Sequence, residues 1–367
     1  MKITVITVCF NSVKTIERTI KSVIAQNYSE LEYIIIDGGS TDGTLDIIRK
    51  YKENLSVWIS EPDNGLYDAM NKGLAKATGE VFAFLNSDDY YTENVLERVN
   101  EYFKTDDVDM VSGNMYICAE GTVKKAVYDK SNRENLFFGV VYPHPALFAR
   151  RELYIKYGGF DTSYKIAADS DWVMKVCLNG AKVICVEDYF TYFSDGGISS
   201  RKQYLALEEE YRMALKYAKL SAYVHMEKRV REFYPAQLKL VERRERKRNA
   251  IEKRTDDIKK LFDYSKAYYI WGIGNRGMEC MELFEYLGLR IVGFIDSYKE
   301  KAQIRGYQVI KPENADLQDP GIRICITPKG YEEEIIRRLK DTGVETGRSF
   351  TYAELLDQMI RLGSIES

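Results

Sequence analysis

Short apolar runs alternate with amphipathic stretches along residues 1–200. The apolar runs have the length of strands and occupy residues 3–8, 33–36, 57–59 and 81–85. The stretches between them carry apolar side chains near helical spacing and occupy residues 13–26, 41–51 and 66–77. This alternation predicts an α/β domain over residues 1–200, in which helices cover a parallel sheet.

The next segment, residues 201–265, contains one proline, no glycine and many charged residues. We expect a helical linker of two helices broken near Pro235, because proline disrupts the interior of a helix. Residues 239–260 hold ten Lys or Arg against five Asp or Glu. Ion pairs on a solvated helix face would account for this composition, and weak contact with an anionic membrane surface is the alternative.

Strand–helix alternation resumes over residues 266–367, which predicts a second, small Rossmann-like α/β domain. An apolar run leads there into three glycines that open a helical stretch: Gly272, Gly274 and Gly277. Asp296 follows a later strand, nineteen residues after Gly277. This is the order of a dinucleotide-binding G-x-G-x-x-G motif. Nucleotide or nucleotide-sugar binding and a structural role both stay open.

Composition narrows the class of protein. The 367 residues exceed one ordinary domain, and 45% of them are hydrophobic, which is enough for real cores. The net charge of -3 gives no general attraction to nucleic acid. No apolar stretch approaches the length of a transmembrane helix. Six cysteines without C-x-x-C spacing, and an N-terminus without a signal-peptide pattern, predict a cytoplasmic protein.

A pair of carboxylates directly follows the fourth predicted strand. The run Val81–Leu85 leads into Asn86, Ser87, Asp88 and Asp89. If this strand is parallel to its neighbours, the pair lies where open α/β sheets bind ligands. Adjacent carboxylates repel one another unless a cation is present, and hard divalent ions prefer such oxygen ligands. The junction therefore predicts a divalent metal site.

The other predicted strands also end in polar clusters. These clusters are Cys9–Ser12 after the first strand, Asp37–Gly43 after the second and Glu61–Gly65 after the third. Because the carboxyl ends of parallel strands meet at one edge, we expect these side chains to converge on one crevice. A turn with a helix cap would explain residues 37–43 alone, and the coincidence of four such ends favours a ligand site.

Four blocks of the sequence are Thr7–Asn11, Asp37–Thr44, Gly65–Gly73 and Asn86–Asp89. Their composition, order and spacing resemble family 2 glycosyltransferases of the A-type fold, and the resemblance covers about residues 1–200. It implies a nucleotide-diphospho-sugar fold and a nucleotide-sugar donor, with a UDP-sugar favoured. It also implies Mn²⁺ or Mg²⁺ as cofactor and inversion at the anomeric carbon.

The resemblance implies roles for individual residues. The residues implied to bind the nucleotide-sugar are Thr7, Asn11, Asp37, Asp68, Asn71, Ser87, Asp88 and His144. Asp89 is the implied metal ligand, and Asp88 is implied to contact the ribose or the metal. Asn86 stands where an aspartate is common, which leaves Asp89 as the chief ligand candidate. Gly38 stands where a second acid is common, so Asp37 carries that role alone.

A further acidic site follows at Ala168–Trp172, which opens a helical stretch. Relatives place the catalytic base in an acidic pair at this point, and here Ala168 replaces the first acid. Asp169 is therefore the implied base, with Asp171 in reserve, although Asp169 would also suit a helix N-cap. A positioned carboxylate can take the proton of an attacking hydroxyl. Phe193–Ser199 resembles the segment that closes over the diphosphate in relatives.

Together these features favour an inverting, metal-dependent glycosyltransferase of bacterial surface polysaccharide synthesis. We expect it to use a saccharide or lipid-linked saccharide acceptor at the inner face of the cell membrane, with no nucleic acid partner; oligomerisation stays open. One alternative is a sugar nucleotidyltransferase, which needs an early glycine-rich loop that residues 9–12 lack. The other is a nucleotide-binding oxidoreductase or scaffold that uses the C-terminal domain.

Overall fold

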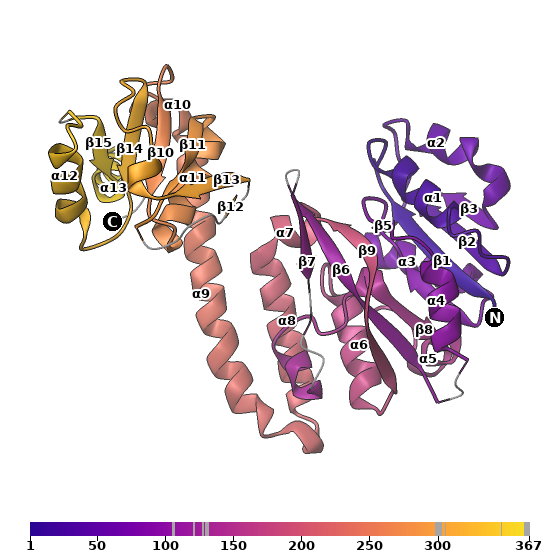
Figure 1. Ribbon diagram of the computed structural model, residues 1–367. Helices are drawn as coiled ribbons and strands as arrows, with labels where there is room; N and C mark the ends of the chain where they lie inside the picture. Colours follow the sequence, from indigo (N-terminus) through magenta and orange to yellow (C-terminus); the bar gives the residue numbers. More distant parts are fainter. Residues whose placement is uncertain are drawn as a thin grey trace. The chain divides into compact units, whose positions relative to one another are not determined.

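The computed structural model describes residues 1–104, 107–119, 122–126, 128, 132–297, 303–304, 306–345 and 347–362. The chain forms two compact units, residues 1–239 and residues 240–367 (Figure 1). The boundary lies inside the segment for which a helical linker is expected. Within the described residues, none of the helices combines the length and the apolar composition that a membrane span requires.

The first unit is built on a parallel core of four strands in the order β3-β2-β1-β4. They are β1 (Ile3–Cys9), β2 (Leu31–Asp37), β3 (Val57–Ser60) and β4 (Val81–Phe84). The remaining strands continue the sheet beyond β4 and are β5 (Tyr90–Tyr91), β6 (Met110–Ala119), β7 (Thr122–Ala126), β8 (Leu147–Arg150) and β9 (Val183–Ser194). The predicted α/β class is confirmed, and the four strands predicted from apolar runs are present.

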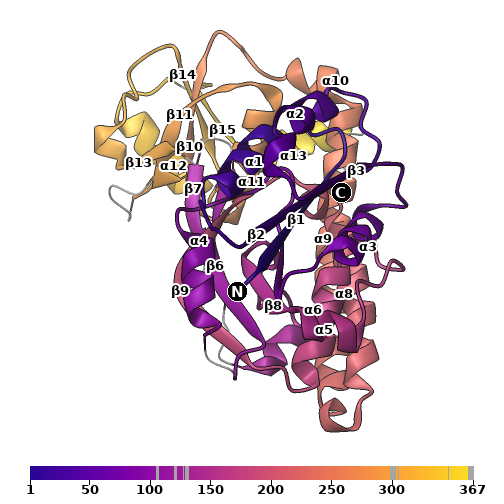
Figure 2. The ribbon, with the colours of Figure 1, turned by 90° about the vertical axis from the view of Figure 1, so that its right-hand side faces the viewer.

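Helices cover both faces of this sheet (Figure 2). One face is covered by α1 (Ile16–Ile24), α2 (Thr44–Lys50) and α4 (Val95–Tyr102). The other face is covered by α3 (Leu66–Lys76), α5 (Arg151–Tyr157) and α6 (Ala168–Leu178). The short 3-10 turns of this unit are η1 (Lys52–Asn54), η2 (Arg133–Phe137), η3 (His144–Ala146) and η4 (Ser221–Tyr223).

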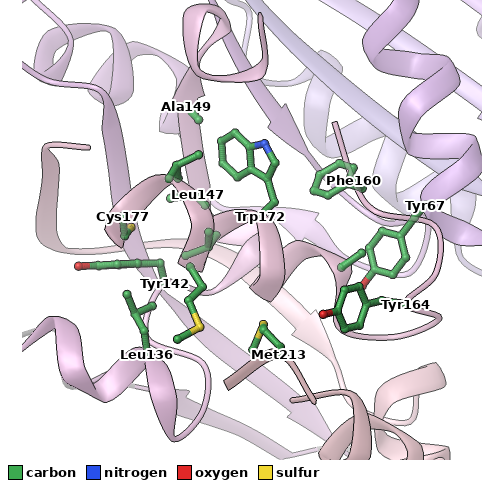
Figure 3. Packing of buried hydrophobic residues seen from close by; sticks show 14 of the residues in the cluster. Tyr67, Leu136, Tyr142, Leu147, Ala149, Phe160, Tyr164, Trp172, Cys177 and Met213 are labelled. Atoms are coloured by element: carbon green, nitrogen blue, oxygen red, sulfur yellow. The ribbon is translucent and has the colours of Figure 1, made fainter. Parts of the chain in front are cut away.

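An aromatic cluster fixes α6 against the sheet (Figure 3). The fully buried indole of Trp172 stacks on Tyr154, with ring centroids 4.1 Å apart. Phe160 lies between this pair and Tyr67 of α3, whose ring centroid is 5.6 Å away. Buried aromatic side chains contribute large apolar areas. The helix that carries Asp169 is therefore held on a rigid support.

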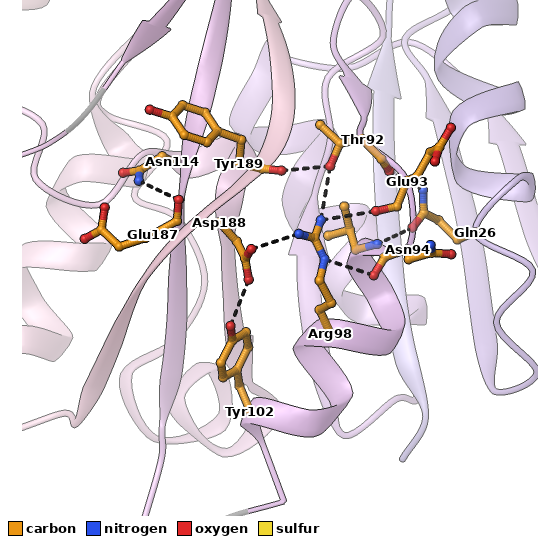
Figure 4. A network of polar contacts seen from close by, with 11 residues as sticks. Gln26, Thr92, Glu93, Asn94, Arg98, Tyr102, Asn114, Glu187, Asp188 and Tyr189 are labelled. Atoms are coloured by element: carbon orange, nitrogen blue, oxygen red, sulfur yellow. Dashed lines mark hydrogen bonds and ion pairs between the residues drawn. The ribbon is translucent and has the colours of Figure 1, made fainter.

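Arg98 of α4 joins the segment behind the acidic pair to β9 (Figure 4). Its guanidinium donates to Asp188 Oδ1 at 3.0 Å, to the Thr92 hydroxyl at 3.3 Å and to the Glu93 carbonyl at 3.1 Å. Gln26 donates to the Thr92 carbonyl at 2.8 Å from the opposite side. These contacts fix the chain just after Asp88–Asp89.

The helices that follow the sheet do not have the boundaries predicted from Pro235. They are α7 (Ile198–Arg201), α8 (Gln203–Ala218), α9 (Met226–Lys253) and α10 (Thr255–Lys259). The predicted break at Pro235 is wrong, because Pro235 lies inside the continuous helix α9 and the interruption falls between α8 and α9. Val230 and Tyr234 of α9 are fully buried in the core of the first unit. This packing holds the helix continuous despite the missing backbone donor of proline.

The described residues of the second unit form a six-stranded sheet in the order β12-β13-β11-β10-β14-β15. Its strands are β10 (Ala267–Trp271), β11 (Arg290–Ile295), β12 (Gln303–Ile304), β13 (Tyr307–Ile310), β14 (Ile322–Ile326) and β15 (Ser349–Thr351). Its helices are α11 (Asn275–Leu287), α12 (Glu332–Asp341) and α13 (Tyr352–Arg361), with the turn η5 (Pro312–Asn314). All pairs except β12·β13 are parallel. The predicted second α/β domain is thus present.

Candidate active site

The carboxyl ends of β1 and β4 lie side by side at a switch point of the first sheet. From β1 the chain continues to β2 and β3 on one side of β1. It then returns to form β4 on the other side of β1, and β8 lies beyond β4. Open α/β sheets hold their ligands at such a point. The hydroxyls of Ser12 and Ser87 join the two strand ends, with their Oγ atoms 2.8 Å apart. Ser87 therefore lies at the expected edge.

Asp37 lies at the end of β2 and is fully buried. Its carboxylate accepts hydrogen bonds from the Ser40 hydroxyl at 2.5 Å, the Ser40 N–H at 2.9 Å and the Ser60 hydroxyl at 2.7 Å. Burial alone would raise the pKa of Asp37, but these donors outweigh burial and hold that pKa below its ordinary value. The carboxylate thus shapes the loop, and its contact with base or ribose stays a prediction.

Asn11 and Thr7 occupy different environments. Asn11 is exposed, accepts a hydrogen bond from the Thr41 N–H at 2.9 Å, and donates its own N–H to Ser40 at 2.7 Å. It thereby joins the loops after β1 and β2. Thr7 is fully buried inside β1, with its hydroxyl 3.1 Å from that of Tyr33. Of the two predicted nucleotide residues, Asn11 is the one that faces solvent.

Asp88 and Asp89 differ sharply in exposure. Asp89 is fully buried, whereas Asp88 is partly exposed. Asp89 Oδ1 accepts a hydrogen bond from the Ser194 N–H at 2.9 Å, and its Oδ2 has no hydrogen-bond partner among the described residues. Burial raises the pKa of both carboxyls, and the charge of Asp88 raises that of Asp89 further. A cation beside the pair would counter both effects.

Arg18 of α1 brings positive charge to this edge, which no sequence motif indicated. It donates to the Asp88 carbonyl at 2.7 Å and to the Ser194 hydroxyl at 3.1 Å, and it lies over the ring of Tyr90 at 4.2 Å. The turn that follows β9 brings Gly197 close to the Asp88 carboxylate. The end of β9, predicted as a segment that closes over the diphosphate, therefore adjoins the acidic pair.

The N-terminal part of α3 carries two further predicted residues, Asp68 in its first turn and Asn71 in the next. The Asp68 carboxylate accepts the Asn64 N–H at 2.9 Å. Asn71 uses both atoms of its amide on the backbone of Phe160, at 2.9 Å each. It therefore positions the loop that leads toward α6. Asp63 was not singled out from the sequence, yet its carboxylate fills the space that a Cβ on Gly38 would need.

Asp169 lies in the first turn of α6 and shares a small cavity with His144. The cavity holds about 10 Å³, roughly one water molecule. Asp169 Oδ1 is 2.8 Å from the hydroxyl of Tyr67, which also contacts the Ile166 carbonyl. His144 stacks on Phe84 at the end of β4, and its Nε2 has no hydrogen-bond partner among the described residues. Burial lowers the pKa of His144, which favours the neutral ring.

Asp171 lies apart from this group. It is fully buried, and its Oδ1 accepts a hydrogen bond from Lys216 of α8 at 2.8 Å. The Tyr217 hydroxyl donates to its backbone carbonyl at 3.3 Å. Asp171 does not line the cavity that Asp169 and His144 share. The two candidate bases therefore have different surroundings, and those of Asp171 are typical of a structural ion pair.

Comparison with known proteins decides the family. A family model described as "Glycosyl transferase family 2" matches residues 4–164. The uncharacterized glycosyltransferase Rv1514c of Mycobacterium tuberculosis (strain ATCC 25618 / H37Rv) is 32% identical over 205 residues, which cover 55% of this chain and 78% of that protein. The chain belongs to glycosyl transferase family 2. The PGL/p-HBAD biosynthesis glycosyltransferase Rv2957 of the same organism is 32% identical over 167 residues, 44% of this chain and 64% of that protein.

Solved structures show the same fold in other glycosyltransferases. Staphylococcus aureus TarS 1-349 in complex with UDP-GlcNAc has a TM-score of 0.51 and 23% identity, covering 61% of this chain and 69% of that one. The mannosyltransferase PcManGT of Pyrobaculum calidifontis, in complex with GDP-Man and Mn²⁺, has a TM-score of 0.50 and 21% identity, covering 65% and 72%. This chain spans 41% of a longer TarS chain. The expected A-type glycosyltransferase fold is confirmed.

The acidic edge of this family 2 glycosyltransferase suits an open metal site. In the part of the chain that the structure describes, no three His, Cys, Asp or Glu side chains form a metal-binding group. Mg²⁺ commonly binds one or two carboxylates and completes its shell with water and substrate phosphates. Asp88 offers an accessible carboxylate, and Asp89 Oδ2 and Asn86 Oδ1 are buried oxygens without described partners. This donor set fits such an ion.

The second unit of the glycosyltransferase has its own candidate ligand site, at the carboxyl end of β10. Gly272 follows β10 with φ +105°, and a Cβ on Gly277 would collide with the Gly272 carbonyl. Gly274 is the residue before α11, and open space surrounds its Cβ position. Asp296 follows β11 as expected. Close helix–strand approach at the third glycine is a feature of dinucleotide-binding turns, and nucleotide binding here stays a prediction.

Proposed function

We propose that the first unit transfers a sugar from a nucleotide-sugar to an acceptor hydroxyl with inversion at the anomeric carbon. The observation that carries this proposal is that the candidate carboxylates lie in two separate positions. Asp88, backed by Asp89, lies beside a cationic Arg18, whereas Asp169 lies in a separate cavity with His144. Family membership supports transfer of a sugar, and the two carboxylate positions support metal binding at one and proton removal at the other.

The donor that we propose is a UDP-sugar. The solved structures of similar fold include TarS with UDP and with UDP-GlcNAc, and a mannosyltransferase with GDP-Man. The nucleotide would lie over the loops after β1 and β2, near Asn11 and Asp63. Its diphosphate would then reach Arg18 and Asp88. Asp37 and Asn71 would act by holding the loops, because their polar atoms already bind neighbouring groups.

Proton transfer in this proposal falls to Asp169. As the acceptor oxygen bonds to the anomeric carbon, its proton passes to Asp169 and the bond from that carbon to the diphosphate oxygen breaks. Attack on the face opposite the leaving diphosphate inverts the configuration. The Tyr67 hydroxyl holds Asp169 in place. A divalent metal would offset the charge that grows on the diphosphate.

The exposure of the two edge carboxylates changes their order as metal ligands. The resemblance favoured Asp89 as the chief ligand. We rank Asp88 first, because it is the accessible carboxylate of the pair. Asp89 would be a second ligand through Oδ2, the buried oxygen that has no partner among the described residues.

The acceptor class that we propose is a saccharide or a lipid-linked saccharide. Similarity to glycosyltransferases that include one named for PGL/p-HBAD biosynthesis supports a role in bacterial glycan synthesis. The basic stretch at 239–260 is compatible with work at the inner face of the membrane. Binding to anionic vesicles, compared with neutral vesicles, tests this placement.

A thermal-shift screen tests the donor proposal. A ligand that binds only the folded state raises the unfolding temperature. UDP- and GDP-sugars are compared with and without Mn²⁺ or Mg²⁺. We expect one nucleotide-sugar to raise Tm only when metal is present. No shift with any nucleotide-sugar would contradict the proposal.

Nucleotide binding by the second unit is a separate candidate function. The close approach of Gly277 to the Gly272 carbonyl favours it, because that packing brings the start of α11 to the end of β10. Binding of NAD(H), a nucleotide or a nucleotide-sugar by residues 240–367 would support it. A Tm that none of the three ligands raises in the absence of metal would favour a structural role.

A further inference from the structure

The second unit has a large cavity at the amino ends of its parallel strands, opposite the glycine turn. The cavity holds about 460 Å³, and residues of β10, β14, β15 and α13 line it. Tyr268 of β10 and Arg323 of β14 are direct neighbours near the starts of their strands, and Ser349 begins β15. Gly272 follows the other end of β10. The volume is typical of small-molecule sites, and the position is separate from the predicted nucleotide site.

Four apolar side chains line the cavity. They are Leu261, Phe262, Phe350 and Leu355. Phe262 packs edge-on against Tyr268 and Phe350, with ring centroids 6.0 Å and 6.4 Å apart. The rings of Phe262 and Phe350 are only half-buried, so part of their apolar surface stays in contact with water. A ligand with an apolar group would remove this surface from water, which is favourable.

Three charged side chains line the same cavity. They are Asp263, Arg323 and Glu354, and they form no ion pair with one another. The guanidinium of Arg323 is half-buried and makes no hydrogen bond or ion pair with the described residues. Asp263 Oδ1 accepts hydrogen bonds from the N–H and the hydroxyl of Ser265, and Glu354 Oε2 accepts one from the Thr351 N–H at 2.7 Å. The second oxygen of each carboxylate makes no hydrogen bond within the described residues.

These charges favour a ligand that carries both signs. The hydroxyl and the N–H of Ser265 hold the pKa of Asp263 below its ordinary value, so its carboxylate is charged at neutral pH. A partly buried charge is stabilised when it gains a charged hydrogen-bond partner. The guanidinium of Arg323 matches a carboxylate, and the two carboxylates of the cavity match an ammonium group.

We propose that this cavity binds a free α-amino acid with a large apolar side chain. The carboxylate of the ligand accepts hydrogen bonds from Arg323, and its ammonium group donates to Asp263 and Glu354. The side chain of the ligand covers Phe262 and Phe350. The site lies outside residues 4–164, which match the family model, and it does not depend on the proposed sugar transfer.

The test is isothermal titration calorimetry on the full chain, in EDTA and without nucleotide-sugar. L-leucine, L-phenylalanine and L-tryptophan are the probes. Phenylpropionate lacks the ammonium group, phenethylamine lacks the carboxylate, and glycine lacks the apolar side chain. We expect at least one probe to bind at one site per chain. Each of the three analogues should bind at least ~10-fold more weakly, because each has lost one of the recognised groups.

Two substitutions locate the site. Arg323→Gln and Glu354→Gln should each lower the affinity for the bound amino acid by ~10-fold or more, because each removes a charged partner. Glutamine can still form the capping box that Glu354 makes at the start of α13, so the fold should be retained. Arg290→Gln and Asp357→Asn are the matched controls, since both residues are exposed and neither lines the cavity. Thermal unfolding of each variant checks the fold.

The proposal would be overturned if none of the three amino acids binds, or if phenylpropionate binds as tightly as L-phenylalanine. Binding that Arg323→Gln leaves unchanged would also contradict it. Binding of UMP that is lost in Arg323→Gln and kept in Gly274→Ala would assign the cavity to a nucleotide and refute the amino-acid site. The titrations contain no nucleotide-sugar, so a failure of the proposed sugar transfer would not change their result.

Discussion

The parallel strands of the two sheets end in edges of similar topology and opposite chemistry. In the first unit, β1 and β4 end beside Asp37, Asp88 and Asp89, and the loop that follows β1 contains no glycine. In the second unit, β10 ends in a turn of three glycines that opens α11. One edge presents carboxylates, and the other presents backbone N–H groups and a helix N-terminus.

This difference teaches what each edge needs in order to hold a phosphate group. Carboxylates repel phosphate, so the first edge requires a cation between them, which a divalent metal would supply with the help of Arg18. Backbone N–H groups at a helix start attract phosphate directly. We therefore expect nucleotide binding at the first edge to depend on metal, and any binding at the second edge to be independent of it.

The largest expected effect concerns the base of the first unit. Asp169→Asn should keep donor binding and lower transfer by ~10²–10⁴-fold, because the amide cannot take the acceptor proton. Transfer rates and donor affinity are measured on the same preparation. Asp171→Asn is the matched control, because it changes the carboxyl two residues away that does not line the cavity. A comparable loss in the control alone would move the base to Asp171.

The next effect concerns the acidic edge itself. Asp88→Asn should lower metal-dependent transfer by ~100-fold or more, since it removes the accessible ligand of the metal ion. That ion would stabilise the charge that develops on the diphosphate by several kcal/mol. The rate is measured across a range of Mn²⁺ concentrations. Asp256→Asn, an exposed carboxylate of the same dipeptide type on α10, should leave the rate unchanged. Unchanged metal dependence in Asp88→Asn would contradict the ligand assignment.

A smaller effect is expected at the glycine edge. Gly277→Ala should destabilise the protein by ~1–3 kcal/mol, because its Cβ has no room beside the Gly272 carbonyl. Gly274→Ala has open space and an ordinary φ of −73°, so it should change stability by less than ~0.5 kcal/mol. Denaturant unfolding measures both. If Gly274→Ala weakens nucleotide binding without loss of stability, the glycine turn after β10 is a nucleotide-binding site.

The smallest effect is expected for the ion pair behind the base. Asp171→Asn should lower the free energy of unfolding by about 1 kcal/mol, because its partner Lys216 is half-exposed and solvent screens the interaction. Urea unfolding of this variant at neutral pH checks the value. A loss above about 3 kcal/mol would show that the pair acts as a fully buried one.

Much of the framework could be predicted from local pattern. The four apolar runs of the first unit became β1 to β4, and the G-x-G-x-x-G turn follows β10 as expected. These elements are predictable because their apolar periodicity and their turn residues lie close together in sequence. Pro235 was misjudged because the burial of Val230 and Tyr234, which keeps α9 continuous, depends on distant contacts.

The site was less predictable, because it is assembled from distant segments. Arg18 reaches Asp88 from α1, and Tyr67 reaches Asp169 from α3. Neither side chain belongs to a motif with the residue that it serves. The exposure of Asp88 and the burial of Asp89 also arise from packing against β9, which adjacent letters in the sequence do not distinguish.

The most direct test of metal-dependent sugar transfer is release of nucleoside diphosphate from nucleotide-sugars by the full chain. The assay uses Mn²⁺ or Mg²⁺, then EDTA, then restored metal. We expect release from at least one nucleotide-sugar in the presence of metal, loss of release in EDTA and recovery when metal returns. Turnover that persists in EDTA, or no turnover of any nucleotide-sugar, would contradict the central claim.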